Sequence, residues 1–261
     1  MSDNGLFGPE SVAWHIHADP VMLIGGMRAL LVQALEPRAM AAVDQHSKFR
    51  EDPWGRLDRT TKFVMDTIYG DTATAEAACD RVRKVHARIH GIDPVTGLAY
   101  AGNDPDLLLW IHAVEVESFV LVYRTYAGRL SDQDADRYAV EMARVAELVE
   151  LPAGMAPQSM GEVREYLRSV RPTLQATPAA FDGLRVVLFP PMAPQYRPLW
   201  VIPTMAAVAI LPRYARRMYR LPWLPGAALP VRAAMYPLSR TLNLMTPIPP
   251  IVRAAHERVA A

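Results

Sequence analysis

Two histidines lie one helical turn apart in the segment RVRKVHARIHG, residues 81–91. Residues at spacings of four, three, four and three form one helix face, which consists of Ala75, Cys79, Val82, His86 and Ile89. An imidazole on such a face can bind haem iron, or it can be a core residue that hydrogen-bonds to a carbonyl. His90 would place a second ring on the same side, as in helical two-histidine metal sites, although no glutamate follows His86 as in HExxH zinc proteases. The residues alone leave these interpretations open.

Upstream, two arginines and a threonine share one predicted helix face. Arg56 and Arg59 are three residues apart, and Thr60 follows Arg56 by four. Two arginines close together at a buried face need an anion, such as a haem propionate or an oxygen-derived anion. The alternative is that they are exposed to solvent or pair with nearby acidic residues, which are Glu51, Asp52 and Asp58.

Two further histidines are candidates for the same site. His112 lies on the most apolar predicted helix with Glu115 one turn later, and a buried His–Glu hydrogen bond would explain the pair. If His86 does not bind haem, then His86, His112 and Glu115 could form a non-haem iron site. His46, at a turn, could contact a propionate or make a turn contact only.

Helix signals follow one another along most of the chain. Asp-Pro, Ser-x-x-Asp or Ser-x-x-Glu patterns begin several predicted helices, and Gly or Pro ends them. We expect helices over residues 19–36, 55–70, 71–91, 103–128, 131–151 and 159–170. The only short strand candidate is LRVVLF, residues 184–189. The pattern predicts an all-α fold with one domain over residues 1–261.

Prolines crowd the chain after position 190, where Trp, Leu, Met and Tyr stay plentiful. We therefore expect a globin-like helical core over residues 10–190, with a Pro-rich part, residues 191–261, that wraps around it in short helices. The longest apolar run, residues 199–211, is shorter than the roughly 20 residues that span a bilayer. Because RYARRMYR follows it at 213–220, residues 199–220 are either a buried segment or a peripheral membrane contact.

The composition narrows the class of protein. A net charge of +1 gives no reason to expect a nucleic-acid partner. The single cysteine, Cys79, and an N-terminus without the pattern of a signal peptide predict a protein of the reducing cytoplasm, with possible peripheral membrane contact. No GxGxxG, Walker A or GxSxG motif supports nucleotide binding or hydrolase chemistry.

Taken together, four segments resemble the MpaB / latex-clearing rubber oxygenase catalytic domain family. They are GGMRALLVQALEPRAMAAV, HSKFREDPWGRLDRTTKFVMDTIYGD, RVRKVHARIHG and DPDLLLWIHAVEVESFVLVYRTYAGRLS. The resemblance covers residues 10–150 well and continues more loosely through the Pro-rich end. It implies an all-helical fold that holds one b-type haem.

The resemblance also assigns roles to residues. An Arg-x-x-His pattern that holds the proximal iron ligand falls on Arg83 and His86. The distal Arg-x-x-Lys-Thr pattern falls on Arg56, Arg59 and Thr60, with arginine in place of lysine, and a second arginine past the ligand becomes His90. The family often has a histidine at the place of His112. Its acidic base has no position that aligns in this chain.

The reaction that the resemblance implies is O2-dependent oxidation or cleavage of a double bond in a hydrophobic, isoprenoid-like substrate. Arg56 and Thr60 would stabilise bound oxygen by hydrogen bonds. Two alternatives stay open: a non-catalytic haem- or lipid-binding helical protein, and a non-haem iron protein.

Overall fold

The computed structural model describes residues 3–222, 224, 226–245 and 247–260, and these form helices joined by short turns. The first half contains α1 (Val12–His17), α2 (Met22–Gln33), α3 (Pro37–His46), α4 (Pro53–Tyr69), α5 (Thr72–His86) and α6 (Pro105–Val122), which continues as the π-helical turn η1 (Tyr123–Ala127). The second half contains α7 (Asp132–Leu148), α8 (Met160–Val170), η2 (Arg171–Thr173), α9 (Pro178–Leu188), η3 (Pro194–Tyr196), α10 (Arg197–Ala209), α11 (Arg213–Met218), α12 (Ala228–Met245) and α13 (Pro250–Ala260). Among the described residues, the only sheet is the antiparallel pair β1 (His90–Ile92) and β2 (Ala99–Ala101). The predicted all-α class is confirmed.

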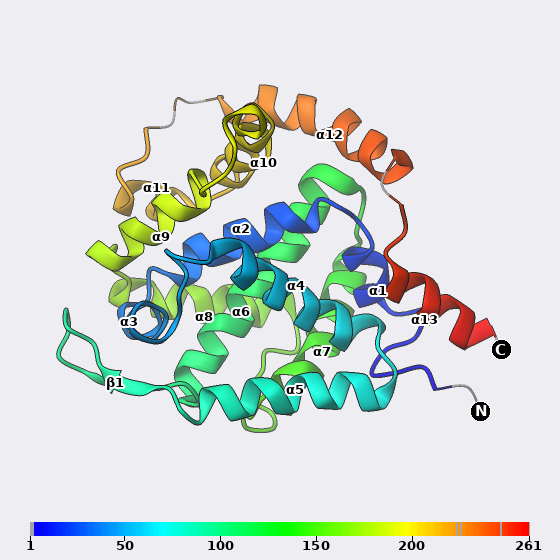
Figure 1. The fold of residues 1–261 in the computed structure, drawn as a ribbon, viewed down its shortest axis with the longest axis horizontal. Helices are drawn as coiled ribbons and strands as arrows, with labels where there is room; N and C mark the ends of the chain where they lie inside the picture. Colours follow the sequence, from blue (N-terminus) through cyan, green and yellow to red (C-terminus); the bar gives the residue numbers. More distant parts are fainter. Residues whose placement is uncertain (1–2, 223, 225, 246, 261) are drawn as a thin grey trace.

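A central pair of helices, α2 and α6, organises the interior (Figure 1). α6 begins at Asp104, whose carboxylate accepts a hydrogen bond from the amide of Asp106, and it is apolar nearly all round, as its sequence predicted. α2 packs along it and buries the guanidinium of Arg28, which pairs with Glu117 and donates to the Ser118 hydroxyl. A buried arginine that is fully paired in this way fixes the two helices relative to each other.

Helices α4 and α5 form an antiparallel hairpin around Gly70. The carboxylate of Asp52 accepts from the amide of Gly55 at the start of α4, and that of Asp71 accepts from Thr74 at the start of α5. The hairpin packs against α1, α7 and α13. In Figure 1 the two helices lie close together at the turn and diverge toward their other ends, the start of α4 and the end of α5.

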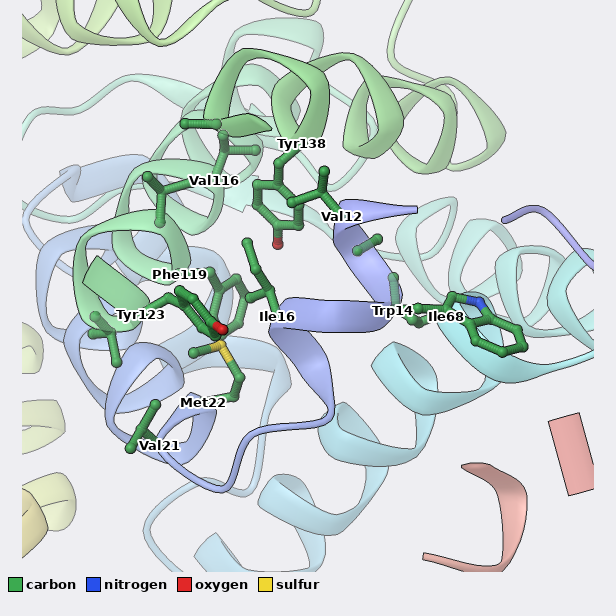
Figure 2. Close-up of a cluster of buried hydrophobic side chains, with 14 of the residues drawn as sticks. Val12, Trp14, Ile16, Val21, Met22, Ile68, Val116, Phe119, Tyr123 and Tyr138 are labelled. Atoms are coloured by element: carbon green, nitrogen blue, oxygen red, sulfur yellow. The ribbon is translucent and has the colours of Figure 1, made fainter. Parts of the chain in front are cut away.

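The main hydrophobic cluster joins the N-terminal helices to α6 and α7. Figure 2 shows Trp14 of α1 beside Ile68 of α4, whereas Ile16 of α1 lies on the side of Phe119 of α6 and Tyr138 of α7. The hydroxyl of Tyr138 lies 2.8 Å from Nε2 of His17, so this buried polar pair is satisfied within the core.

The Pro-rich part forms short helices at the edge of the molecule. Figure 1 shows α10, α11 and α12 gathered along one side, and α13 lies beside α4 near the N-terminus. α12 packs on α10 and on the π-helical turn, where Ser239 donates a hydrogen bond to the carbonyl of Tyr126. Across the described residues, none of the helices combines the length and the apolar character needed to cross a membrane.

Local signals placed most helix starts correctly. Ser131 and Ser159 accept hydrogen bonds from the amides of Asp134 and Glu162, as their spacing predicted. Asp19, in contrast, is not the N-cap of α2. Its carboxylate accepts from the amide of Val21 in a preceding turn, and the helix begins at Met22.

Two predicted elements are wrong. LRVVLF belongs to α9 and not to a strand, because Thr177 accepts from the amide of Ala180 and starts a helix at Pro178 whose inner face buries Leu184. The third predicted helix ends at His86 and not near Gly91, because residues 90–92 pair with residues 99–101. The carboxylate of Asp93 fixes the turn of this β-hairpin by accepting from the amides of residues 95 and 96.

Candidate functional site

His86 is the last residue of α5 and lies on its inner face. Ala75 and Cys79, earlier on that face, are fully buried, and His86 is half-buried. Its Nδ1 atom is buried and has no hydrogen-bond partner among the described residues. Desolvation lowers the pKa of His86, and the charge of Glu150 opposes this effect. The ring is therefore neutral at pH 7 and offers an unpaired nitrogen, which is the form that binds a metal.

Arg83, one turn before His86, ties α5 to α7. Its Nη1 donates a hydrogen bond of 2.6 Å to the carbonyl of Leu148, and its guanidinium also pairs with Asp80. The carbonyl is one of the last of α7, which helix geometry leaves without an intrahelical partner. These contacts give Arg83 a positioning role at the end of α5, and its predicted contact with a cofactor stays a prediction.

His90 lies in β1 and is exposed. Because α5 has ended, the helical i, i+4 arrangement with His86 does not form. Its carbonyl lies 3.2 Å from Nε2 of His46, which is also 3.3 Å from the hydroxyl of Tyr100. The structure thus brings His46 and His90 together, through a backbone contact between α3 and the β-hairpin.

The three residues predicted on α4 differ in their surroundings. Arg56 is half-buried, with its guanidinium carbon 5.9 Å from the centre of the Phe49 ring, and no ion pair between described residues involves it. Desolvation and the charge of Arg59 lower the pKa of Arg56. Arg59 is exposed and pairs with Asp52 at 3.3 Å, and Thr60 is exposed and donates to the carbonyl of Arg56. A desolvated arginine without a carboxylate partner has the chemistry of an anion site.

The hairpin geometry relates Arg56 to His86. Arg56 lies 14 residues before Gly70 on α4, and His86 lies 16 residues after it on α5. With a rise of about 1.5 Å per residue on both helices, the two side chains belong to the same end of the hairpin. This is the end at which α4 and α5 diverge in Figure 1.

On α6, His112 is buried and Glu115 is half-buried, and the two side chains do not bond to each other. No residue that the structure describes bonds Nε2 of His112, and burial lowers the pKa of this side chain to about 4. Glu115 accepts a long hydrogen bond of 3.4 Å from Gln33 of α2, and desolvation raises its pKa to about 7. The His–Glu hydrogen bond that would make this pair purely structural is therefore not formed, and the buried His112 nitrogen and the half-buried Glu115 carboxylate stay available to a ligand.

The described residues can be tested for a metal site or a haem site. No group of three His, Cys, Asp or Glu side chains comes together there in a way that could hold a metal ion, so His86, His112 and Glu115 do not form the predicted non-haem iron triad. Haem requires only one protein ligand, because the porphyrin supplies four nitrogens. One unpaired, neutral imidazole nitrogen and one desolvated arginine fit that smaller requirement.

Two glycines, Gly102 beside His86 and Gly26 on α2, were not among the residues that the sequence analysis singled out. A Cβ at Gly102 would lie 2.7 Å from the carbonyl oxygen of His86, so the glycine is needed for the close approach of the two segments. A Cβ at Gly26 on α2 would meet nothing within 4 Å, so this helix borders open space there. Only the Gly-Gly pair inside an otherwise apolar helix hinted at the second.

Comparison with known proteins adds an independent finding. A family model described as "ER-bound oxygenase mpaB/B'/Rubber oxygenase, catalytic domain" matches residues 14–240. No curated protein and no solved structure matches the chain significantly. The family match covers α2, α4, α5 and α6 together with most of the Pro-rich part. The chain therefore belongs to the family of MpaB and rubber oxygenase catalytic domains, which is a family of oxygenases.

Proposed function

We propose that this protein is a haem b-dependent oxygenase in which His86 would bind the haem iron, and that it uses O2 to oxidise or cleave a hydrophobic, isoprenoid-like substrate. The observation that carries the proposal is the buried, unpaired Nδ1 of His86 in a chain of an oxygenase family. Bound haem would supply the binding and activation of O2, and the chain's own residues would prepare the site.

The first task of the chain is to keep His86 neutral and in place. Desolvation disfavours its imidazolium form, so a lone pair is available at neutral pH. The hydrogen bond from Arg83 to the carbonyl of Leu148 anchors the last turn of α5 to α7. Either nitrogen of a neutral imidazole can bind a metal, and Nδ1 is the buried one that no described residue bonds.

The second task of the chain is to compensate the negative charge of a bound anion. Arg56 has lost much of its hydration and has no carboxylate partner, so it can donate N–H bonds to an anion with little competition from the protein. A propionate or an oxygen-derived anion has the required chemistry. Thr60, one turn along, can add a hydroxyl on the same face of α4. Such donors act more strongly where water is excluded.

A third contribution concerns protons. Glu115 has a pKa of about 7, so it can either hold or accept a proton near neutral pH. Nε2 of His112, three residues earlier on α6, is unpaired as well. We propose that these two side chains would border the bound substrate, as a proton-holding carboxyl group and a neutral imidazole. A mostly apolar interior suits a substrate without charges.

The absorption spectrum of the protein produced with added haem tests the ligand. We expect a Soret band that His86→Ala reduces by ~10-fold or more, and that added imidazole partly restores in His86→Gly. His256→Ala, which removes an exposed histidine of α13, is the matched control and should keep the band. A full Soret band in His86→Ala would contradict the assignment of this ligand.

Oxygen uptake with a panel of isoprenoids tests the reaction. Haem-loaded protein should consume O2 in the presence of at least one long-chain alkene, and His86→Ala should not. A Soret band without O2 consumption for any member of the panel would instead indicate a haem carrier. Iron without a Soret band would indicate a non-haem iron protein.

A further inference from the structure

The charges of the chain are strongly segregated. Residues 183–256 contain nine arginines and no aspartate, glutamate or lysine, although the whole chain has a net charge of only +1. The remaining residues therefore carry an excess of negative charge. This acid-free segment includes α10, α11 and α12, which lie along one side of the molecule in Figure 1. That side is consequently cationic.

Most of these arginines are at the surface. Arg197 at the start of α10, Arg213 and Arg217 on α11, and Arg220 after it are exposed. No ion pair between described residues involves these four side chains, whereas the exposed Arg185 of α9 pairs with Asp182. Their charges are thus available to an external anionic surface.

The same side is also apolar. On the outer face of α10, Leu199 is 66 % exposed, and Ile202 and Met205 lie one and two turns further on with about 40 % exposure each. Phe189, just after α9, is 76 % exposed. Large side chains exposed together in this way mark an interaction surface.

An open pocket of about 890 Å³ lies within this surface. Its walls include Phe189, Trp200, Val201, Met205 and Leu221, with Arg197 as the charged residue of the lining. Apolar side chains from α9, α10 and the segment after α11 therefore surround one depression. Arg197 is itself part of this lining, and the exposed Arg220 directly precedes Leu221 in the chain, so arginines and apolar residues meet at the pocket.

We propose that this surface, formed by residues 189–222, docks onto an anionic lipid bilayer. The exposed apolar side chains would enter the acyl region, and the arginines would lie at the headgroup level, as in monotopic membrane contacts. A second copy of the chain fits less well, because its arginines would face those of the first. An acidic protein or nucleic acid would leave the apolar side chains and the pocket uncovered. The proposal does not depend on haem or on the reaction.

Vesicle flotation with the full chain tests the proposal. We expect binding to vesicles of phosphatidylcholine with about one-third phosphatidylglycerol to exceed binding to pure phosphatidylcholine by ~10-fold or more, and to fall on addition of salt. Arg213→Glu combined with Arg217→Glu should reduce binding to the anionic vesicles by ~10-fold or more. Phe189→Ser combined with Leu199→Ser should reduce it to a similar extent.

Matched control variants make the same changes elsewhere on the surface. Arg164→Glu with Arg168→Glu changes two exposed arginines of α8, and Leu98→Ser with Val140→Ser removes two exposed apolar side chains from the β-hairpin and α7. Both should bind as the unchanged chain does, with thermal unfolding verifying that all variants are folded. Equal binding to neutral and anionic vesicles, or equal losses in test and control variants, would overturn the proposal. So would a dimer in sedimentation velocity that only the 189–222 variants convert to monomer.

Discussion

Gly102 lies directly against the backbone of His86. A Cβ atom added at Gly102 would stand 2.7 Å from the carbonyl oxygen of His86 and 3.0 Å from its Cα. The amide of Gly102 also donates a 2.7 Å hydrogen bond to the carbonyl of Ile89. The end of the β-hairpin thus packs closely against the last turn of α5. This contact fixes the position of His86, the proposed haem ligand.

Gly102→Ala should therefore displace His86. The new methyl group would meet backbone atoms, which cannot move aside as a flexible side chain could, so we expect a loss of about 1–3 kcal/mol in the free energy of unfolding. The Soret absorbance per protein should fall as well. Gly161→Ala on α8 is the control, because a Cβ there would lie 3.5 Å from the Ser159 hydroxyl, an ordinary van der Waals contact. Unchanged stability and haem content in Gly102→Ala would show that the contact is not needed.

Features that depend on near neighbours in the chain could be predicted from the sequence. Ser131, Ser159 and Asp71 cap helices because their side chains reach amides three residues ahead. The apolar face through Cys79 and His86 follows from helical periodicity in the same way. These local rules were sufficient to place His86 on an inward face.

Features that depend on contacts between distant segments could not be predicted. α5 ends at His86 because residues 90–92 pair with residues 99–101, and nothing in the segment RVRKVHARIHG predicts that pairing. The bond from Gln33 to Glu115 and the contact of Gly102 with His86 likewise join segments far apart in the sequence. The surface around residues 189–222 was only partly visible as an apolar run followed by arginines.

The two arginines of α4 should have different effects when replaced. Arg56→Gln removes a desolvated cation that has no ion-pair partner, so the haem-free protein should keep its stability. If Arg56 compensates an anion, haem affinity or turnover should fall ~10-fold or more. Arg59→Gln removes an exposed charge paired with Asp52 and should change stability by about 0–1 kcal/mol. Haem titration and O2 uptake measure these effects. A larger loss of haem affinity or turnover in Arg59→Gln than in Arg56→Gln would contradict the role given to Arg56.

Glu115 should make the protein less stable at alkaline pH. Its pKa of about 7 in the folded protein exceeds the ordinary value of 4.5, so the folded state binds the proton more tightly, and stability falls as the pH rises from 4.5 through 7. Glu115→Gln removes this effect. Relative to the unchanged chain, the free energy of unfolding of the variant should be about 1–3 kcal/mol more favourable at pH 8 than at pH 5, as measured by urea unfolding.

A control for Glu115 is available at the surface. Glu165→Gln on α8 replaces an exposed carboxylate and should shift stability equally at both pH values. The same outcome in Glu115→Gln would mean that water reaches the Glu115 carboxylate in the folded protein. Haem content of the variant, measured in parallel, separates a change in pocket chemistry from a change in folding.

A comparison of His112 with His17 tests how an unpaired buried nitrogen affects the free energy of unfolding. Burial lowers the pKa of both side chains to about 4, so the unfolded state binds more protons than the folded state below pH 6.5, and stability falls as the pH decreases toward 4. Replacing either histidine with leucine should weaken this acid sensitivity. At pH 7 the two should differ, because His17 is bonded to Tyr138 and Nε2 of His112 is bonded to nothing.

We expect His17→Leu to cost about 1–3 kcal/mol at pH 7, because it leaves the buried Tyr138 hydroxyl without its partner. His112→Leu should cost less or stabilise the haem-free protein, since it removes a buried polar atom that is unsatisfied there. Urea unfolding of the haem-free variants from pH 4 to pH 8 measures both effects. A loss in His112→Leu as large as that in His17→Leu would mean that His112 has a partner in solution, whereas preserved stability with a reduced Soret band would indicate that its nitrogen is kept free for the bound ligand.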